Sequence, residues 1–461
     1  MRKVLLLLII FYVWRIACYA QKDFNVWCFG KQAGLDFNSG SPVAFSGVMM
    51  STEAGNSSIA DSSGSLLFYT DGVSVWNRHD TVMTHGTMLW GGWASTQSAL
   101  IVKMPGSATL YYIFTTDEAL GPNGFCYSIV DMSLNGGLGD VAVKNVQLFS
   151  PCAEKVCATL AANDTDVWVL AHEAGTNKFR AYLLTSTGLS AAPVIASAGS
   201  VHPATSHGVV GYMKFSPDGK HLALAVRYQY LFELFDFNSL TGIVSNPVTF
   251  TADHLTYGVE FSPDNTKLYL ADTALYQYDI TGGNGSSIIS TKTKISNDAW
   301  ALQLGPDKKI YCATFFTGYL DVINTPDSSG AACNYAANAV SLGASISASR
   351  LGLPNHIARP FKISQPTDSS SSSLGDTQCL IQNLKIYPNP VSDKLILSLP
   401  TQQWSGDITI TNMLGEGLAP KIMYESENIR SIPIMDLSDG IYIIKLNACS
   451  QTVIKKFAVI H

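Results

Sequence analysis

Apolar and polar residues alternate in short runs along most of this chain, and the clearest runs repeat. Phe215–Ala225, Phe261–Ala271 and Leu304–Ala313 each hold a Pro-Asp pair followed by alternating apolar residues. The prolines at 217, 263 and 306 are 46 and 43 residues apart, close to the period of a four-stranded propeller blade. Proline followed by Asp and Gly or Asn favours a tight reversal between two strands. A further apolar run follows each copy, at Leu231–Phe237, Leu275–Ile280 and Tyr319–Ile323.

Weaker copies of the same pattern precede these three, beginning at Asp61, Pro105 and Asn163. Taking one buried second-strand residue from each copy gives Trp27, Phe68, Tyr112, Trp168, Leu224, Tyr269 and Tyr311. The pattern therefore predicts an all-β chain with a seven-bladed β-propeller over residues 21–363. The first blade starts without an innermost strand, which Ser349–Ile357 could supply. A strand from the other end would close the ring and leave no open sheet edge.

The last part of the chain has a different pattern. Serines dominate residues 364–378, which carry too little apolar surface to fold and are predicted to form a linker. Period-2 runs then follow at Lys394–Leu399, Asp407–Thr411, Ile441–Leu446 and Val453–Val459, separated by turn residues. Residues 379–461 are thus predicted to form a small immunoglobulin-like β-sandwich.

The turn and strand residues of this end segment resemble the type A sorting domain of the Bacteroidetes type IX secretion system. A secreted immunoglobulin-like module of another kind is the alternative. The resemblance is carried by Tyr387, Pro388, Asn389, Pro390, Leu414, Gly415, Gly440, Tyr442, Lys455 and Lys456. It implies recognition by the type IX secretion machinery, and delivery through the periplasm to the outer cell surface or the medium.

The propeller region also resembles known families. Its Ser-Pro-Asp-Gly copies are similar to repeats related to the WD family, without the Trp-Asp dipeptide. Most of residues 24–360 looks like Bacteroidetes secreted propellers that carry the motifs found here at 68–72, 133–140 and 351–355. That resemblance implies no particular activity.

The start of the chain has the pattern of a signal peptide over residues 1–20. Arg2 and Lys3 precede an apolar run, and Ala20 stands at the expected cleavage position. Arg15 makes the run too short for a permanent span, so the mature chain is predicted to lack a transmembrane segment. Cys18 leaves a lipoprotein signal as the alternative.

Composition and motifs narrow the functional classes. A formal charge of −6 and 14% charged residues argue against nucleic-acid binding. Its cysteines form no Cys-x-x-Cys pair, and no metal or cofactor is expected. His172-Glu173 and Asp117-Glu118 place neighbouring side chains on opposite faces of a strand, which disfavours a shared metal or an acid–base pair. Gly136–Gly139 is better explained by a turn than by a phosphate loop, because no helix follows it.

Polar and aromatic residues stand just ahead of the innermost strands, where a propeller would gather them around one rim of its channel. They are Asn56, Gln97, His207, Tyr257, Trp300 and Arg350. Such groups around a depression can bind a ligand, although rim positions are also polar simply because they face water. The sequence thus predicts a non-catalytic binding or scaffolding protein with an extracellular protein or glycan ligand. The alternative is a secreted propeller enzyme of glycosidase, lyase or esterase type.

Overall fold

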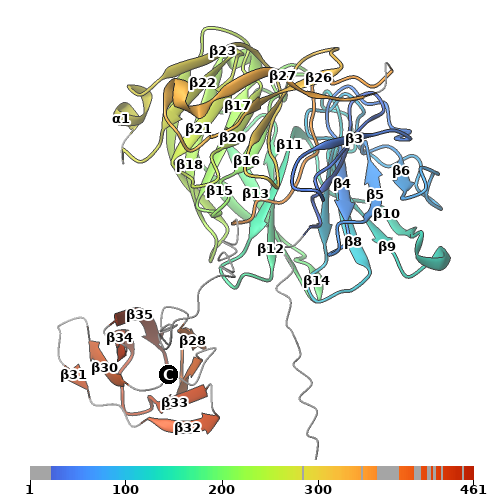
Figure 1. Ribbon diagram of the computed structural model, residues 1–461. Coiled ribbons are helices and arrows are strands. Elements are labelled where there is room, and N and C mark those ends of the chain that lie inside the picture. Colours follow the sequence, from blue (N-terminus) through green and yellow to red (C-terminus); the bar gives the residue numbers. More distant parts are fainter. Residues whose placement is uncertain are drawn as a thin grey trace, which may run out of the picture. The chain divides into compact units, whose positions relative to one another are not determined.

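The computed structural model describes residues 22–282, 285–343, 346–360, 384–398, 406–412, 417–418, 422–426, 429–448 and 451–461. The chain divides into two compact units, Met1–Ser364 and Gln365–His461 (Figure 1). The predicted signal peptide (1–20) and the predicted linker (364–378) lie outside the described residues. No helix in the described parts of the chain is long and apolar enough to cross a membrane.

The described residues of the first unit form seven separate antiparallel sheets, which follow one another in sequence order. Two sheets have three strands, β1 (Val26–Phe29), β2 (Ala33–Asp36) and β3 (Val43–Phe45), then β4 (Ser57–Ala60), β5 (Leu66–Thr70) and β6 (Val75–Asn77). The third sheet contains β7 (Ala99–Lys103), β8 (Leu110–Thr116), β9 (Phe125–Asp131) and β10 (Asp140–Phe149). The fourth contains β11 (Cys152–Leu160), β12 (Val167–Glu173) and β13 (Lys178–Thr185), with β14 (Gly188–Leu189) and β15 (Val194–Ser197) both paired to β13.

The remaining three sheets of this unit have four strands each. They are β16 (Met213–Phe215), β17 (His221–Val226), β18 (Leu231–Asn238) and β19 (Ile243–Thr251), then β20 (Gly258–Phe261), β21 (Lys267–Ala271), β22 (Thr273–Asp279) and β23 (Thr293–Ala299), then β24 (Leu302–Leu304), β25 (Ile310–Ala313), β26 (Tyr319–Ile323) and β27 (Tyr335–Ser341). Short helical turns lie at η1 (Asn135–Gly137), η2 (Arg227–Gln229), α1 (Gly285–Ile289) and η3 (Gly330–Cys333).

The repeated Pro-Asp turns join first and second strands, as the sequence predicts. Ser216 Oγ donates to Asp218 Oδ1 at 2.7 Å and accepts from His221 N at 2.9 Å. The carboxylate of Asp218 in turn accepts from Lys220 N at 3.1 Å. Gly219 between them has a φ of +69°, the left-handed conformation that the reversal requires. Side chains of the turn thus satisfy its own backbone and connect β16 to β17.

The seven predicted anchor residues each lie in a different sheet and are at most 6% exposed. Six of them lie on the second strand of their sheet, whereas Trp27 lies on β1, the first strand of its own. In the first sheet, β1 therefore occupies the place that the second strand occupies in the other six sheets, and no strand of that sheet precedes it among the described residues. Trp27 also contacts Tyr311 of β25 edge-on, with ring centroids 5.3 Å apart. The seventh sheet accordingly packs against the first.

The prediction that Ser349–Ile357 forms the missing first strand is wrong, because the segment makes no ladder. Residues 346–358, which we call the crossing segment, make single-residue bridges instead, from Ala348 to Lys31, from Pro354 to Asn56 and from Ala358 to Thr159. The segment therefore leaves the first sheet and passes the second and fourth. Pro354 has no N–H to contribute to a ladder, which favours a crossing path over continuous pairing.

Asn355 is the centre of this crossing segment. It is 2% exposed, and its N donates to Asn56 O at 2.8 Å. Its Nδ2 donates to Val156 O at 2.9 Å and to Ala99 O at 3.4 Å. Ser57 Oγ donates to its carbonyl at 2.7 Å. One buried amide residue thus joins the inner strands β4, β7 and β11.

The second unit has two four-stranded antiparallel sheets around one apolar core. Their strand orders are β28 (Lys385–Tyr387), β29 (Lys394–Ser398), β33 (Ile429–Pro433), β32 (Met423–Ser426), and β31 (Gly417–Leu418), β30 (Gly406–Asn412), β34 (Gly440–Ala448), β35 (Gln451–Val459). Leu397 and Ile432 of one sheet share that core with Ile444 and Phe457 of the other. The four predicted period-2 runs correspond to β29, β30, β34 and β35.

Asn355→Asp should lower the free energy of unfolding of the first unit. The substitution keeps the side-chain shape but turns an oxygen, in place of Nδ2, toward the carbonyls of Val156 and Ala99. Leaving buried polar groups unpaired costs about 1–3 kcal/mol each, so a loss of about 2–4 kcal/mol is expected. Urea unfolding of the mature protein measures it, with the exposed Asn297→Asp as the matched control. Equal midpoints for the two variants would contradict the central role of Asn355.

Candidate functional site

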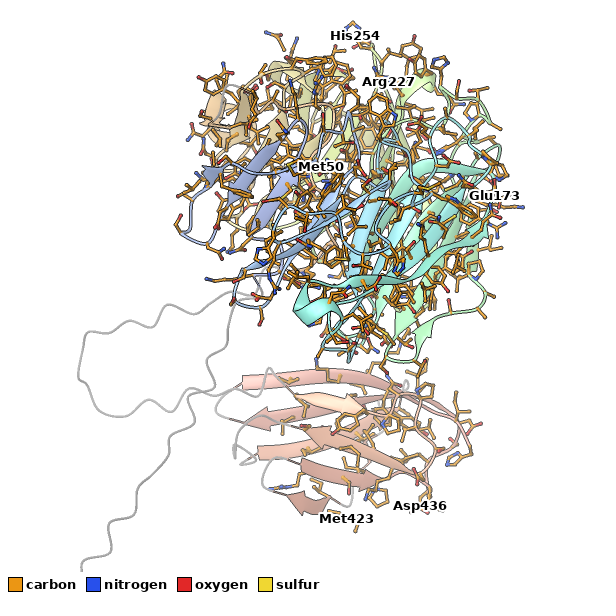
Figure 2. The ribbon with its side chains drawn as sticks, turned by 90° about the vertical axis from the view of Figure 1, so that its right-hand side faces the viewer. Met50, Glu173, Arg227, His254, Met423 and Asp436 are labelled. Carbon is orange, nitrogen blue, oxygen red and sulfur yellow. The ribbon has the colours of Figure 1, made fainter. Side chains whose placement is uncertain are left out.

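Four of the six predicted rim residues lie at one edge of the sheets, together with two turns that sequence reasoning did not include. His207, Tyr257 and Trp300 immediately precede first strands, while η2 and Phe315-Phe316 follow second strands. In an antiparallel sheet the start of one strand and the end of the next meet at the same edge. Figure 2 labels Arg227 of η2 at the end of the unit where His254 also projects.

Aromatic rings and two guanidinium groups form a continuous row along this edge, which we call the aromatic row. It consists of His207, Arg227, Tyr228, Tyr257, Trp300, Phe315, Phe316 and Arg350. The ring of Trp300 lies 5.7 Å from Tyr257 and 6.0 Å from Phe315. Tyr228 is 42% exposed and Phe316 is 57% exposed, so the row presents apolar faces to solvent. Contiguous exposed aromatics of this kind mark a binding surface more often than a packing surface.

Arg227 lies among three rings of the row. Its Cζ is 5.2 Å from the Trp300 ring centroid, 5.3 Å from Tyr257 and 5.8 Å from Tyr228. It directly follows β17, and its aromatic surroundings depend on how three separate loops fold together. The adjacent Tyr257 is 3% exposed, and burial raises the pKa of its hydroxyl, so the phenol stays neutral beside the cation.

Arg350 is at the other end of the row and has a different environment. Its Cζ lies 3.8 Å from the Phe316 ring centroid, and its Nη1 lies 3.5 Å from Glu53 Oε1. The predicted role of this residue as a free cation for a ligand carboxylate is therefore weakened, because a protein carboxylate already accompanies it.

Asn56 and Gln97, the other two predicted rim residues, are fully buried. Gln97 Oε1 accepts from Met213 N at 2.8 Å, and its Nε2 donates to Met213 O at 3.0 Å. Nδ2 of Asn56 donates to Ala54 O at 2.9 Å. Both contact the crossing segment around Asn355, so the structure separates them from the aromatic row and gives them a structural role.

A buried lysine supports the loop that carries His207. Lys155 is fully buried, and its Nζ donates to Val209 O at 2.8 Å and Val210 O at 3.1 Å. Burial lowers the pKa of Lys155 to about 7, against the opposing charge of Glu154. Glu154 accepts from Thr96 N, Thr96 Oγ1 and Ala119 N at 2.8–2.9 Å. These groups hold neighbouring loops together below the row.

Two histidines stack beneath the same loop. His172 of β12 and His202 have ring centroids 3.6 Å apart, and both are at most 1% exposed. Burial lowers the pKa of both rings, assisted by the positive charge of nearby Lys155. Glu233 Oε2 lies 3.9 Å from His202 Nε2. Glu173, which follows His172 in β12, pairs with Arg180.

Acidic residues at equivalent strand ends serve their own turns. Asp71 accepts from Val73 N and Ser74 N, and Asp117 accepts from Glu118 N and Asn123 N. Asp272 accepts from Ala274 N at 3.3 Å. Among the described residues, no group of three or more His, Cys, Asp or Glu side chains is placed to hold a metal ion.

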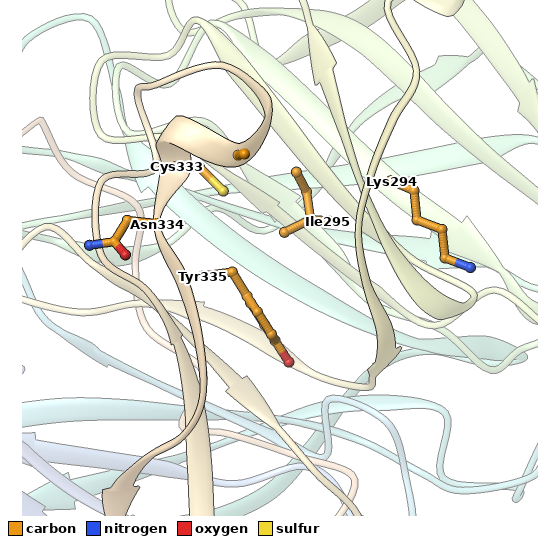
Figure 3. Close-up of a pocket in the computed structure, with 6 residues that line it drawn as sticks. Lys294, Ile295, Cys333, Asn334 and Tyr335 are labelled. Atoms are coloured by element: carbon orange, nitrogen blue, oxygen red, sulfur yellow. The ribbon is translucent and has the colours of Figure 1, made fainter.

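A hollow of about 270 Å³ lies between β23 and η3, away from the residues of the row (Figure 3). Its lining consists of Lys294, Ile295, Ala331, Cys333, Asn334 and Tyr335. The Cys333 thiol is buried, and burial raises its pKa, which disfavours a nucleophilic role. The six described cysteines are all free and buried.

The second unit brings most of the predicted sorting residues to one region. Asn389 Oδ1 accepts from Ala458 N at 2.8 Å, and its Nδ2 donates to Lys456 O at 3.3 Å. The exposed loop of Tyr387–Pro390 is thereby fastened to β35, which also carries Lys455 and Lys456. Tyr442 of β34 stacks on Phe457 of β35 at 5.7 Å. Gly440 begins β34, whereas Leu414 and Gly415 lie outside the described residues.

Residues 385–460 match the family model of the secretion system C-terminal sorting domain. The protein is exported to the cell surface or beyond it. The sorting domain also makes it a substrate of the type IX secretion machinery. No curated protein matches the chain.

Solved structures similar to this chain share little sequence with it. A protein of unknown function from Desulfotomaculum acetoxidans is 10% identical, with a TM-score of 0.44, over 72% of this chain and 99% of that one. A provisionally named 6-phosphogluconolactonase of Bacteroides fragilis is 12% identical, with a TM-score of 0.45, over 72% and 98%. A periplasmic gluconolactonase of Pseudomonas aeruginosa is 11% identical, with a TM-score of 0.36, over 76% and 97%. Similarity at this level transfers no activity to this chain.

Stability of the first unit should fall as the pH drops below about 6.5, the ordinary pKa of histidine. The pKa values of His172 and His202 are lower in the folded state, so unfolding takes up protons at acid pH. Each group then removes up to about 1.4 kcal/mol of stability per pH unit until the pH reaches its folded pKa. Urea unfolding between pH 7 and pH 4.5 should show a shallower slope for His202→Gln than for the parent. The exposed His79→Gln is the control, and equal slopes for all three proteins would contradict this account.

Proposed function

We propose that this protein is an exported seven-bladed β-propeller that binds an extracellular partner through the aromatic row. The immunoglobulin-like sandwich at the end of the chain serves its export. The observation that carries the binding function is the row itself. Rings from successive loops contact one another there, several of them are exposed, and Arg227 among them pairs with no carboxylate of the described residues.

Three features support the propeller. Seven antiparallel sheets follow one another, each anchor residue lies in its own sheet, and Trp27 of the first sheet packs on Tyr311 of the seventh. Such an arrangement protects sheet edges without a second layer. The crossing segment with Asn355 joins the two ends of the ring.

Binding is favoured over catalysis by the kind of side chain at this edge. A glycosidase needs two carboxylates beside the scissile bond, one with a raised pKa. Here Glu53 accompanies Arg350, while Asp71, Asp117 and Asp272 accept hydrogen bonds from their own turns. Flat aromatic faces and guanidinium groups dominate instead, and these groups contribute most to binding energy at interfaces.

Deletion of Lys385–His461 should stop export without unfolding the first unit. The sorting domain has its own apolar core, so its removal leaves the core of the first unit intact. We expect the truncated protein to accumulate in the periplasm, measured by cell fractionation and by protease resistance of the first unit. Asn389→Ala, which releases the Tyr387–Pro390 loop from β35, should reduce export in the full chain. Normal secretion of the truncated protein would contradict the proposed export role.

Trp300→Ala and Tyr228→Ala should each weaken partner binding by about fivefold or more, equivalent to about 1 kcal/mol. The mature protein is first tested on arrays of extracellular polysaccharides and peptides, and affinities for the strongest binder are then measured by biolayer interferometry. The matched control is Leu240→Ala, which removes a side chain that is 75% exposed in the turn between β18 and β19, at the opposite edge. Parent-like affinity in both row variants would contradict the proposal, as would failure of the parent to bind any array component.

A further inference from the structure

We propose that the ligand of the aromatic row is a carboxylated sugar and that Arg227 binds its carboxylate. This inference rests on the proposed binding function and adds the chemical class of the ligand. It depends on a difference between Arg227 and the other arginines of the same unit.

Four of the five described arginines in the first unit have a partner within the protein. Arg180 pairs with Glu173 and Arg359 pairs with Asp23, both at 2.6 Å, while Arg350 lies 3.5 Å from Glu53. Arg78 Nη1 donates to Gly137 O at 2.8 Å. Among the described residues, Arg227 has neither a hydrogen-bond acceptor nor a carboxylate within ion-pairing distance. Its guanidinium N–H groups are therefore available to an acceptor outside the protein.

The surroundings of Arg227 hold the guanidinium in place without neutralising it. Contacts with the rings of Tyr228, Tyr257 and Trp300 are electrostatically favourable for a cation but provide no hydrogen-bond acceptor in the plane of the group. The turn that carries Arg227 is itself fixed, since Tyr230 N donates to Arg227 O and Gln229 Nε2 donates to Val201 O. A planar guanidinium fixed in this way suits bidentate binding of a carboxylate.

The charge balance favours a ligand with one negative charge at this position. The whole chain has a formal charge of −6, which disfavours strongly polyanionic ligands. The second guanidinium of the row already has Glu53 beside it. A single carboxylate at Arg227 is therefore the anion that the row can accept without a further positive charge to balance it.

The flat faces beside Arg227 favour a sugar over a peptide. Tyr228 and Phe315 are exposed and Trp300 is half-buried, so the row offers apolar planes next to the cation. Peptides commonly bind by pairing with an open strand or by inserting an apolar helix face into a groove. The row is built from turns rather than from a strand edge. A sugar ring can lie on an aromatic plane while its carboxylate reaches Arg227.

The experiment uses the mature protein with a neutral oligosaccharide that ends in one glucuronate residue as the probe, and the same oligosaccharide after chemical reduction of its single carboxyl group. Isothermal titration calorimetry should show that reduction weakens binding to the parent at least tenfold. Arg227→Gln should weaken binding of the native oligosaccharide to a similar extent. Reduction of the ligand should then have little further effect on this variant, because both changes remove the same interaction. Arg78→Gln is the matched control and should bind like the parent.

Other outcomes separate the two proposals. Equal binding of native and reduced oligosaccharide that still depends on Trp300 would overturn the carboxylate inference but support the proposed function. Arg227-dependent binding of a peptide with a free C-terminal carboxylate, without binding of the glucuronate-terminated oligosaccharide, would overturn the sugar as ligand. Binding that changes with neither Arg227 nor Trp300 would overturn both proposals.

Discussion

The first unit depends on the hydrogen bonds of one buried amide, Asn355. Its backbone and side chain bond to the inner strands of three sheets, and Gln97 continues the network to Met213 of the fifth. These groups lie in a low-dielectric interior, where an unmade hydrogen bond is far more costly than in water. The crossing segment near the end of this unit is thereby held against the first sheets of the chain. Most of its residues nevertheless form no β-ladder with those sheets.

This network also determines where a ligand can bind. Asn56 and Gln97 precede inner strands just as Tyr257 and Trp300 do, but the crossing segment occupies the space beside them. Both amide atoms of Gln97 and the Nδ2 of Asn56 are hydrogen-bonded inside the protein. Further along the edge, Tyr228 after β17 and Phe315 and Phe316 after β25 are exposed to solvent. The buried amides at one part of the edge and the exposed rings at another make the candidate site asymmetric.

Local features of the fold could be predicted from the sequence, and non-local ones could not. The turn at Ser216–Gly219 is determined by side chains within five residues, so the local sequence pattern was sufficient to predict it. The anchor positions follow from strand periodicity. Asn389 and the strand β35 could be identified because the sorting motif lies within one small domain. By contrast, the path of residues 346–358 depends on partners about 200 to 300 positions away, and an apolar run alone does not distinguish a paired strand from a crossing segment. Arg227 closely follows a predicted apolar run, but its contacts with three rings depend on three separate loops coming together.

The contrast between Arg350 and Arg227 makes the site more than an exposed apolar patch. Both guanidinium groups contact aromatic rings, and both lie partly out of water. Glu53 offsets the desolvation of Arg350, whereas only ring quadrupoles offset that of Arg227. Removing a charge from water without a counter-ion is unfavourable for folding. Local features that work against stability are expected where binding requires them, because a ligand can later supply the missing interaction. The unpaired cation among stacked rings is such a feature, and it places the recognition chemistry at Arg227 rather than at the better-compensated Arg350.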